Sequence, residues 1–173
     1  MDNRKDNPMR SIRIEKVVVN MGVGEGGEKL KKAEQVMEQL TGQKPVKTLA
    51  KKTNRDFGIK KGMSIGCKVT LRKDKAIDFL KKALWVRDYK IPKWSFCDGT
   101  LSFGIKEHTE FEGMKYQPEI GIFGLDVCVT FERKGYRVKR RRIARSNLPE
   151  KEKIKSDEII DYMKKEFNVE VIE

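Results

Sequence analysis

The alternation of hydrophobic and polar residues predicts several short β-strands. Residues 67–72 show it most clearly, because Cys67, Val69 and Leu71 alternate with polar side chains at the two-residue period of a strand. Residues 13–21 are rich in β-branched residues, and residues 96–105 and 121–131 alternate in the same way. Pro45 begins a further extended segment. A hairpin turn at residues 134–135 is expected to lead into a strand over residues 136–141, and residues 169–172 could add a last strand.

Three other stretches have the spacing of amphipathic helices. Residues 28–40 and residues 74–88 each place apolar side chains on one helical face. A short last helix is expected over residues 157–167, with Ser156 as its cap and two acids in its first turn, where the helix dipole favours them. The apolar positions of the first two helices are Leu30, Ala33, Met37 and Leu40, and Ile77, Leu80, Ala83 and Leu84.

The order of these elements predicts an α+β fold in a single domain spanning residues 1–173. Strands come in adjacent runs with few helices between them, which favours a mostly antiparallel sheet with helices packed on one face. The other face of such a sheet stays exposed, and in residues 67–72 it would present Lys68, Thr70 and Arg72. Residues 1–10 are polar and expected to be flexible, and residues 54–66, which contain three glycines, are expected to form a mobile loop.

Basic residues are concentrated in two blocks. The 173 residues include 39 Lys and Arg against 26 Asp and Glu, for a net charge of +13. Residues 43–73 contain ten basic residues and one acid, and residues 133–145 contain eight basic residues and no acid. A merely soluble, highly charged surface would intersperse both signs instead. Blocks of one sign favour a nucleic-acid partner, because each neutralised phosphate releases counterions. A membrane partner is not expected, since no basic helix with a wide apolar face and no apolar run of about 20 residues occurs.

No catalytic, metal or cofactor site is expected. The three cysteines lie about 30 residues apart, without a CxxC pair, and His108 is the only histidine, which argues against zinc and places the protein in a reducing compartment, the cytoplasm. His108 itself falls in a polar stretch and is expected to be a solvated loop residue. Gly22, Gly24 and Gly27 have the spacing of a dinucleotide-binding turn, but the chain lacks the strand–helix alternation of a parallel sheet. Two other interpretations stay open: a tight strand-to-helix turn, and amide groups that meet an RNA phosphate.

Four sequence blocks in order carry a resemblance to a known family. Residues 14–25 (IEKVVVNMGVGE), 41–45 (TGQKP), 65–72 (IGCKVTLR) and 123–129 (FGLDVCV) resemble the large-subunit ribosomal protein five family, and the similarity extends over roughly residues 9–172. The basic segment followed by a last helix and strand is similar to the archaeal–eukaryotic branch, and an archaeal member is expected.

The resemblance implies a binding surface for 5S rRNA in the central protuberance of the large subunit. Family members grip 5S rRNA with polar side chains on the exposed sheet face, and the matching positions here are Asn20, Gln43 and Thr70. Amide and hydroxyl side chains suit sugar hydroxyls and base edges. Lysine and arginine near these positions are candidates for phosphate contacts, although any one of them could be a solvated surface charge; they are Lys47, Lys51, Lys52, Lys68 and Arg72.

The resemblance also implies further partners. The loop at residues 54–66 matches the family's loop that reaches the P-site tRNA, where Arg55, Lys60 and Lys61 could meet phosphates and Phe57 could stack or anchor the loop. Family members touch large-subunit rRNA and a small-subunit head protein across an intersubunit bridge, and the protein is expected to be a monomer off the ribosome. The second basic block is a candidate for further rRNA contact through Arg137, Lys139, Arg140, Arg141 and Arg142. The competing classes are a nucleotide-dependent enzyme that uses the glycine turn and a basic assembly factor without a fixed place on the ribosome.

Overall fold

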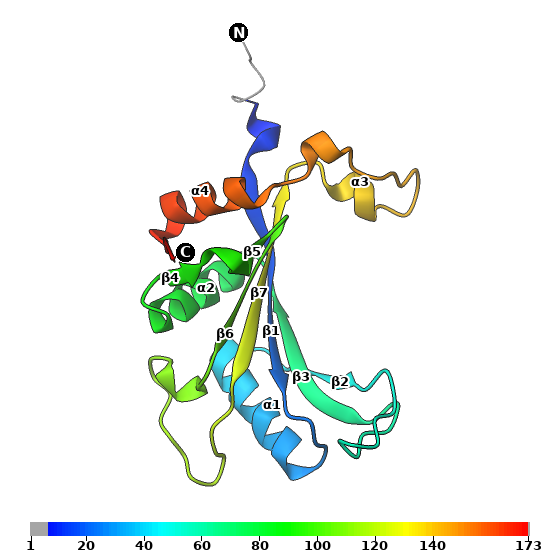
Figure 1. The fold of residues 1–173 in the computed structure, drawn as a ribbon, viewed down its shortest axis with the longest axis vertical. Helices are drawn as coiled ribbons and strands as arrows, with labels where there is room; N and C mark the ends of the chain where they lie inside the picture. The colour runs from blue at the N-terminus through cyan, green and yellow to red at the C-terminus, as the bar shows by residue number, and fades with distance from the viewer. Residues whose placement is uncertain (1–6, 173) are drawn as a thin grey trace.

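Residues 7–172 are described in a computed structural model and form an α+β structure (Figure 1). A six-stranded sheet, antiparallel throughout, has the strand order β2-β3-β1-β7-β6-β5. A second, parallel pair joins β4 to β8. The strands are β1 (Ile12–Gly22), β2 (Val46–Leu49), β3 (Ser64–Leu71), β4 (Lys90–Pro92), β5 (Phe96–Cys97), β6 (Thr100–Ile105), β7 (Leu125–Arg133) and β8 (Glu170–Ile172). The helices are α1 (Glu28–Thr41), α2 (Asp74–Val86), α3 (Arg137–Arg140) and α4 (Ser156–Phe167).

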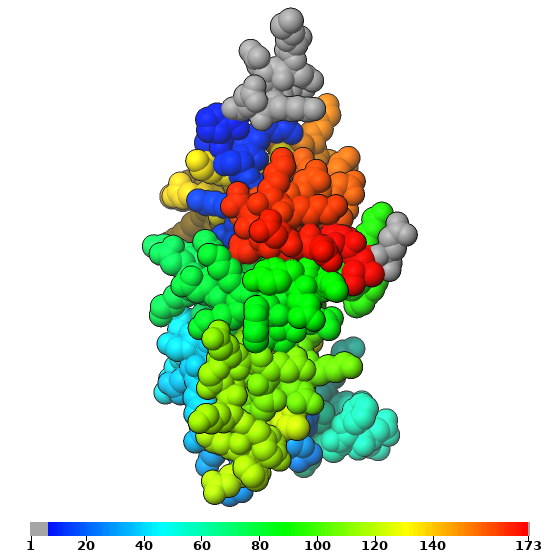
Figure 2. Space-filling model, turned by 90° about the vertical axis from the view of Figure 1, so that its left-hand side faces the viewer, coloured from blue at the N-terminus to red at the C-terminus, as the bar shows by residue number. Residues whose placement is uncertain are grey.

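The hydrophobic core lies on one side of the large sheet. Every second residue of β1, β3, β6 and β7 is buried on that side, as in Val17, Val19 and Met21 of β1. The helices α1, α2 and α4 lie on this side in Figure 1, and Figure 2 looks onto the layer they form together with residues 106–124. The predicted α+β class, with helices on one face of a mostly antiparallel sheet, is therefore confirmed.

Two helices end where the chain can adopt a left-handed conformation. Gly42 follows α1 with φ 61°, and its N–H donates to the Glu38 carbonyl at 2.8 Å. Asn168 follows α4 with φ 52°. Glycine and asparagine are the residues that tolerate this conformation at a helix end. Because α1 and α4 end at these residues, β2 follows α1 and β8 follows α4 after short turns.

Several local predictions are wrong. The expected strand over residues 96–105 is two strands, because the chain turns at Asp98 and Gly99, where φ of Gly99 is 77°. Within residues 136–141, Arg137–Arg140 forms the short helix α3, and no strand is present there. Ile77 lies outside the buried face of α2 and is 36% exposed. The side chain of Ser156 does not cap α4; the Glu158 carboxylate instead accepts the Lys155 N–H at 3.3 Å.

The predicted flexibility of the N-terminus can be compared with the structure only in part. The expected flexibility of residues 1–10 falls mainly on residues 1–6, which lie outside the described residues, whereas Pro8–Arg10 forms a short 3-10 turn. Over the described range, none of the helices has the length and apolar character needed to cross a membrane.

Candidate nucleic-acid interface

The face of the large sheet opposite the helices is lined by polar side chains at its centre. Strand pairing places Asn20 of β1 directly opposite Lys68 of β3, and Val18 directly opposite Thr70. Paired residues in a sheet point to the same side, so Asn20, Lys68 and Thr70 share this face. Lys68 and Thr70 are exposed and Asn20 is half-buried. Three side chains predicted separately to bind RNA are therefore brought together, and we call this surface the open sheet face.

Strands β6 and β7 extend the open sheet face with residues that the sequence analysis did not propose as ligands. Thr130 of β7 is paired with Lys16 of β1 on one side and with Thr100 of β6 on the other. Ser102 is paired with Cys128 in the next row. Small hydroxyl side chains leave the backbone approachable, which suits a surface that receives RNA. The alternation within each strand predicts which of its residues are exposed, but it does not predict which residues of neighbouring strands lie side by side.

The other predicted phosphate ligands are placed less uniformly. Lys47 is paired with Cys67, whose side chain is in the core, and its ammonium lies 3.6 Å from the Glu34 carboxylate on α1. Lys47 therefore lies on the helix side and not on the open sheet face. Arg72 follows β3 and forms an ion pair with Glu15 at 3.6 Å. Gln43 lies in the turn between α1 and β2, and Lys51 and Lys52 are exposed just beyond β2.

The connection between β2 and β3 is a small hairpin with its own hydrogen bonds. Ala50 N–H donates to the Met63 carbonyl at 2.8 Å, and Asn54 and Ile59 exchange bonds of 2.8 and 2.9 Å. The hairpin leaves at the β1 C-terminal end of the sheet, at the lower right in Figure 1. Whether it moves stays a prediction. All four residues proposed to contact tRNA are exposed on it, and Phe57 is 74% exposed: Arg55, Phe57, Lys60 and Lys61.

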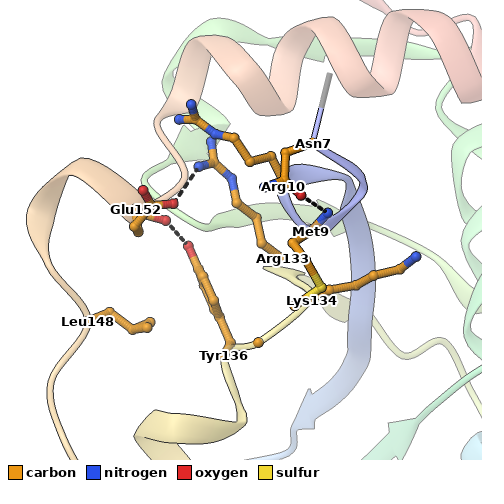
Figure 3. A pocket seen from close by; sticks show the side chains of 9 residues that line it. Asn7, Met9, Arg10, Arg133, Lys134, Tyr136, Leu148 and Glu152 are labelled. Atoms are coloured by element: carbon orange, nitrogen blue, oxygen red, sulfur yellow. Dashed lines mark hydrogen bonds and ion pairs between the residues drawn. The ribbon is translucent and has the colours of Figure 1, made fainter. Parts of the chain in front are cut away.

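Residues 134–155, which we call the arm, leave the opposite end of the sheet. Figure 1 shows the arm and the β2–β3 hairpin projecting on the same side. Figure 3 shows how the arm is attached: Arg133, only 4% exposed, forms an ion pair with Glu152, and the Tyr136 hydroxyl donates to the Glu152 carbonyl. Arg133 also donates to both oxygens of the Glu158 carboxylate at 2.7 Å. Burial raises the pKa of the Tyr136 hydroxyl, so it stays a hydrogen-bond donor at neutral pH.

A second set of ion pairs fixes the arm to the open sheet face. The buried Glu132 carboxylate accepts hydrogen bonds from Arg13, the shorter at 2.6 Å, and from Arg140. Arg140 also pairs with Glu15. Charge-assisted bonds to a buried carboxylate are stronger than exposed pairs. Of the five arm residues predicted to contact rRNA, Arg140 is therefore occupied in holding the arm, and Arg141 donates to the Ala144 carbonyl at 2.7 Å. Arg137, Lys139 and Arg142 are exposed, and within residues 7–172 no carboxylate lies within ion-pair distance of them.

The glycine turn after β1 is explained by its backbone geometry. Gly24 and Gly27 have φ of 80° and 89°, which side chains rarely tolerate, and the N–H groups of Val23 and Gly24 both donate to the Ile65 carbonyl. The sheet is antiparallel here, so the crevice of a parallel dinucleotide-binding sheet does not form. Of the three interpretations, the tight turn is confirmed, the dinucleotide site is wrong, and a phosphate contact at the start of α1 stays a prediction.

His108 was expected to be solvated, and this expectation is wrong. The residue is 2% exposed, and its Nδ1 accepts the Phe123 N–H at 3.2 Å, which closes the loop between β6 and β7. Burial lowers the pKa of His108 because the charged form is disfavoured away from water. The residue holds a loop in place. Over the described part of the chain, no three His, Cys, Asp or Glu side chains are grouped so as to hold a metal ion.

Comparison with known families identifies the chain. The model of ribosomal protein L5 matches residues 7–60, and the model of the C-terminus of the same ribosomal family matches residues 64–160. The chain belongs to the ribosomal protein L5 family. Among similar proteins, the large ribosomal subunit protein uL5 of Thermoplasma volcanium is 53% identical over 168 residues, covering 96% of this chain and 99% of that protein. Proteins of the same name from Sulfurisphaera tokodaii and Methanococcus maripaludis are each 50% identical, covering 96% and 95% of this chain and 96% and 93% of their own lengths.

These relatives are archaeal, so the chain is an archaeal-type member of the L5 family, as the sequence blocks predicted. A ribosomal protein of this family is a structural component and not an enzyme, which removes the nucleotide-dependent enzyme from consideration. Its place in the cytoplasmic ribosome and its RNA-binding character agree with the two basic blocks. The open sheet face, the β2–β3 hairpin and the arm are therefore candidate RNA-binding surfaces of an L5 family protein.

Proposed function

We propose that this protein is a structural constituent of the large ribosomal subunit that binds 5S rRNA with its open sheet face and attaches it in the central protuberance. The observation that supports this most strongly is the strand register that groups Asn20, Lys68 and Thr70 on an uncovered surface. Asparagine and threonine supply hydrogen bonds to sugars and base edges, and Lys68 supplies a phosphate contact. The relatives carry the name of a large-subunit protein, which agrees with this role.

The two projections beside the open sheet face extend the proposed interface. The exposed cations of the β2–β3 hairpin, with Phe57 at 74% exposure, suit the backbone and an unpaired base of the P-site tRNA. Arg137, Lys139 and Arg142 of the arm suit further phosphates of large-subunit rRNA. A contact with a small-subunit head protein across an intersubunit bridge, and a monomeric state off the ribosome, complete the proposal on the strength of the family resemblance.

Binding of a 5S rRNA transcript over a salt series tests the proposal. The logarithm of affinity should fall steeply with the logarithm of salt concentration, by about 0.7–0.9 per phosphate contact. Lys68→Ala should lower this slope by about 1, because it removes a phosphate contact from the open sheet face. Lys82→Ala is the matched control, since Lys82 is an exposed lysine on α2, on the covered side. Equal slopes for the two variants, or weak salt-insensitive binding by the unaltered protein, would show that the sheet face is not the 5S rRNA site.

A second test concerns hydrogen bonding rather than charge. Thr70→Ala and Asn20→Ala should each weaken 5S rRNA binding by about 1–3 kcal/mol, as the loss of a direct contact does. Retention of the wild-type affinity by both folded variants would exclude direct recognition by these two side chains. An assembly factor would leave the large subunit in a high-salt wash, whereas the constituent proposed here should stay bound to it.

A further inference from the structure

A cavity of about 670 Å³ opens where the arm overhangs the open sheet face. Its floor is the row formed by Lys16, Thr130 and Thr100, which adjacent strands place side by side. The opposing wall comes from residues 136–154 of the arm. The cavity is therefore continuous with the proposed RNA surface and lies at the end of the sheet opposite the β2–β3 hairpin.

The walls of this cavity are held in position by ion pairs. Arg140 bridges the arm to Glu132 and Glu15 on the sheet, and Arg133 and Tyr136 anchor the start of the arm to Glu152. Glu132 is 5% exposed and receives Arg13 as well. Because these contacts are made within the protein, the cavity is formed before any partner arrives. A preformed site binds its ligand with a smaller ordering cost.

The lining combines apolar surface with unused polar groups. The half-buried side chain of Leu148 contributes apolar surface, and the ring of Tyr136 adds an aromatic one. Among the described residues, the hydroxyls of Thr100 and Thr130 and the amide of Asn147 have no hydrogen-bond partner. Three lysines lie at the cavity, Lys16, Lys139 and Lys153. Apolar walls with a few polar groups are typical of sites for small planar ligands.

We propose that this cavity receives a single unpaired nucleotide of the 5S rRNA bound on the open sheet face. The base would lie against Tyr136 and Leu148, and the polar edge of the base would meet Thr130, Thr100 and Asn147. The volume lies within the range of roughly 300–1,000 Å³ of small-ligand pockets, which admits one nucleotide and excludes a duplex. The lysines then face the adjoining phosphates.

The charges of the lining indicate an RNA-tethered nucleotide rather than a free one. Four basic side chains of the lining, Lys16, Lys139, Arg140 and Lys153, face three carboxylates, those of Glu15, Asp98 and Glu132, so the excess positive charge is small. A free nucleotide would gain little attraction from it, whereas RNA already bound to the sheet face presents its nucleotide at high effective concentration. The inference therefore rests on the proposed function and adds a second, base-specific contact to it.

Filling the cavity without changing its charge tests this inference. Asn147→Phe places a large side chain in the lining, and Ser146→Phe is its matched control on the adjacent exposed residue, which does not line the cavity. Asn147→Phe should weaken 5S rRNA binding by at least tenfold, in line with the loss of a stacked base. The salt dependence should stay unchanged, because no phosphate contact is removed. Ser146→Phe should bind within twofold of wild type.

Base-specific chemical probing of the complex gives a second reading. One unpaired base of 5S rRNA should be protected by the wild-type protein and reactive in the Asn147→Phe complex. Thr130→Val keeps the side-chain volume and the strand preference but loses the hydroxyl, and it should weaken 5S rRNA binding several-fold. This variant replaces Asn147→Phe as the test if Asn147→Phe alters the fold. If the wild-type protein binds 5S rRNA and these variants do so equally well with the same protection pattern, the cavity is no nucleotide site although the proposed function stands. If the wild-type protein fails to bind 5S rRNA, both proposals fall.

Discussion

Gly66 lies where three strands approach closely, and its replacement gives a direct test of the sheet geometry. Gly66 of β3 is paired with Gly22 of β1 and with Thr48 of β2. A Cβ atom on Gly66 would lie 2.5 Å from the Met21 carbonyl oxygen and 2.9 Å from the Thr48 hydroxyl oxygen. Atoms in ordinary contact are about 3.5–4.0 Å apart, so β1 or β2 would have to move. Gly66→Ala should therefore strain the sheet that carries the proposed RNA site.

The expected cost can be worked out from two opposing effects. Overpacking a tightly packed site by one carbon costs about 1–3 kcal/mol. Replacing glycine by alanine in a strand stabilises the folded state by about 0.5–1 kcal/mol, because the unfolded chain loses conformational freedom. Because the closest contact, at 2.5 Å, is with a backbone oxygen, the cost should lie in the upper part of its range, about 2–3 kcal/mol, and the net loss in the free energy of unfolding should be about 1–2 kcal/mol. For a chain of this length each kcal/mol corresponds to about 2–4 °C in Tm, so Tm should fall by about 2–8 °C.

Gly104→Ala is the matched control for this prediction. Gly104 lies in β6 on the same side of the sheet, and a Cβ there would be 3.5 Å from an oxygen of Asp126, an ordinary contact. Its Tm should stay the same or rise by up to about 4 °C. Thermal unfolding followed by circular dichroism measures both variants. If Gly66→Ala melted together with wild type and Gly104→Ala, the close approach of β1, β2 and β3 at Gly66 would be refuted.

Two further predictions concern buried titratable groups. The pKa of His108 in the folded protein lies below the ordinary value of 6.5, so the unfolded chain binds the proton more readily. The contribution of neutral His108 to stability should therefore be fully present above pH 6.5 and be lost as the pH falls below 6.5. Tm measured from pH 7 to 5.5 should decline less in His108→Gln than in wild type, and parallel profiles would show that His108 is not buried in solution. Burial raises the pKa of the Cys67 thiol to about 11, whereas Cys97 is exposed, so at pH 8 a thiol reagent should label Cys97 rapidly and Cys67 only after unfolding. Peptide mapping should distinguish Cys67 from the half-buried Cys128, and rapid labelling of the Cys67 peptide in the folded protein would contradict the buried position.

The sequence predicted the elements whose periodicity is strong. The alternation in residues 67–72 placed Lys68 and Thr70 correctly on the open sheet face, and the helix over residues 28–40 was located to within one residue. These patterns are decisive because a strand or helix with one buried face must repeat its apolar residues at a fixed period. The open sheet face was predictable for the same reason.

The features that local patterns did not predict share a different physical cause. Lys47 remains a predicted phosphate ligand, but the side of the sheet on which it lies depends on the pairing of β2 with β3, which no local pattern specifies. His108 lies in a polar stretch, and its burial results from packing against Phe123, fifteen residues further on. The start of the arm was predicted to be a strand, whereas it is a short helix held by the ion pairs of Arg140 with Glu15 and Glu132 of the sheet. Contacts between distant segments, not local preference, determined these parts.

The most direct test of the central proposal is a map of ultraviolet crosslinks between the intact protein and 5S rRNA, read by mass spectrometry of the crosslinked peptides. We expect crosslinks in the segments 16–20 and 68–72, in which alternate side chains such as Lys16, Asn20, Lys68 and Thr70 line the open sheet face, and in the arm beside it. Peptides from α1, α2 and α4 should remain free of crosslinks. Crosslinks concentrated on these helices, with none on β1 or β3, would show that RNA binds the other side of the molecule and would contradict the proposed function.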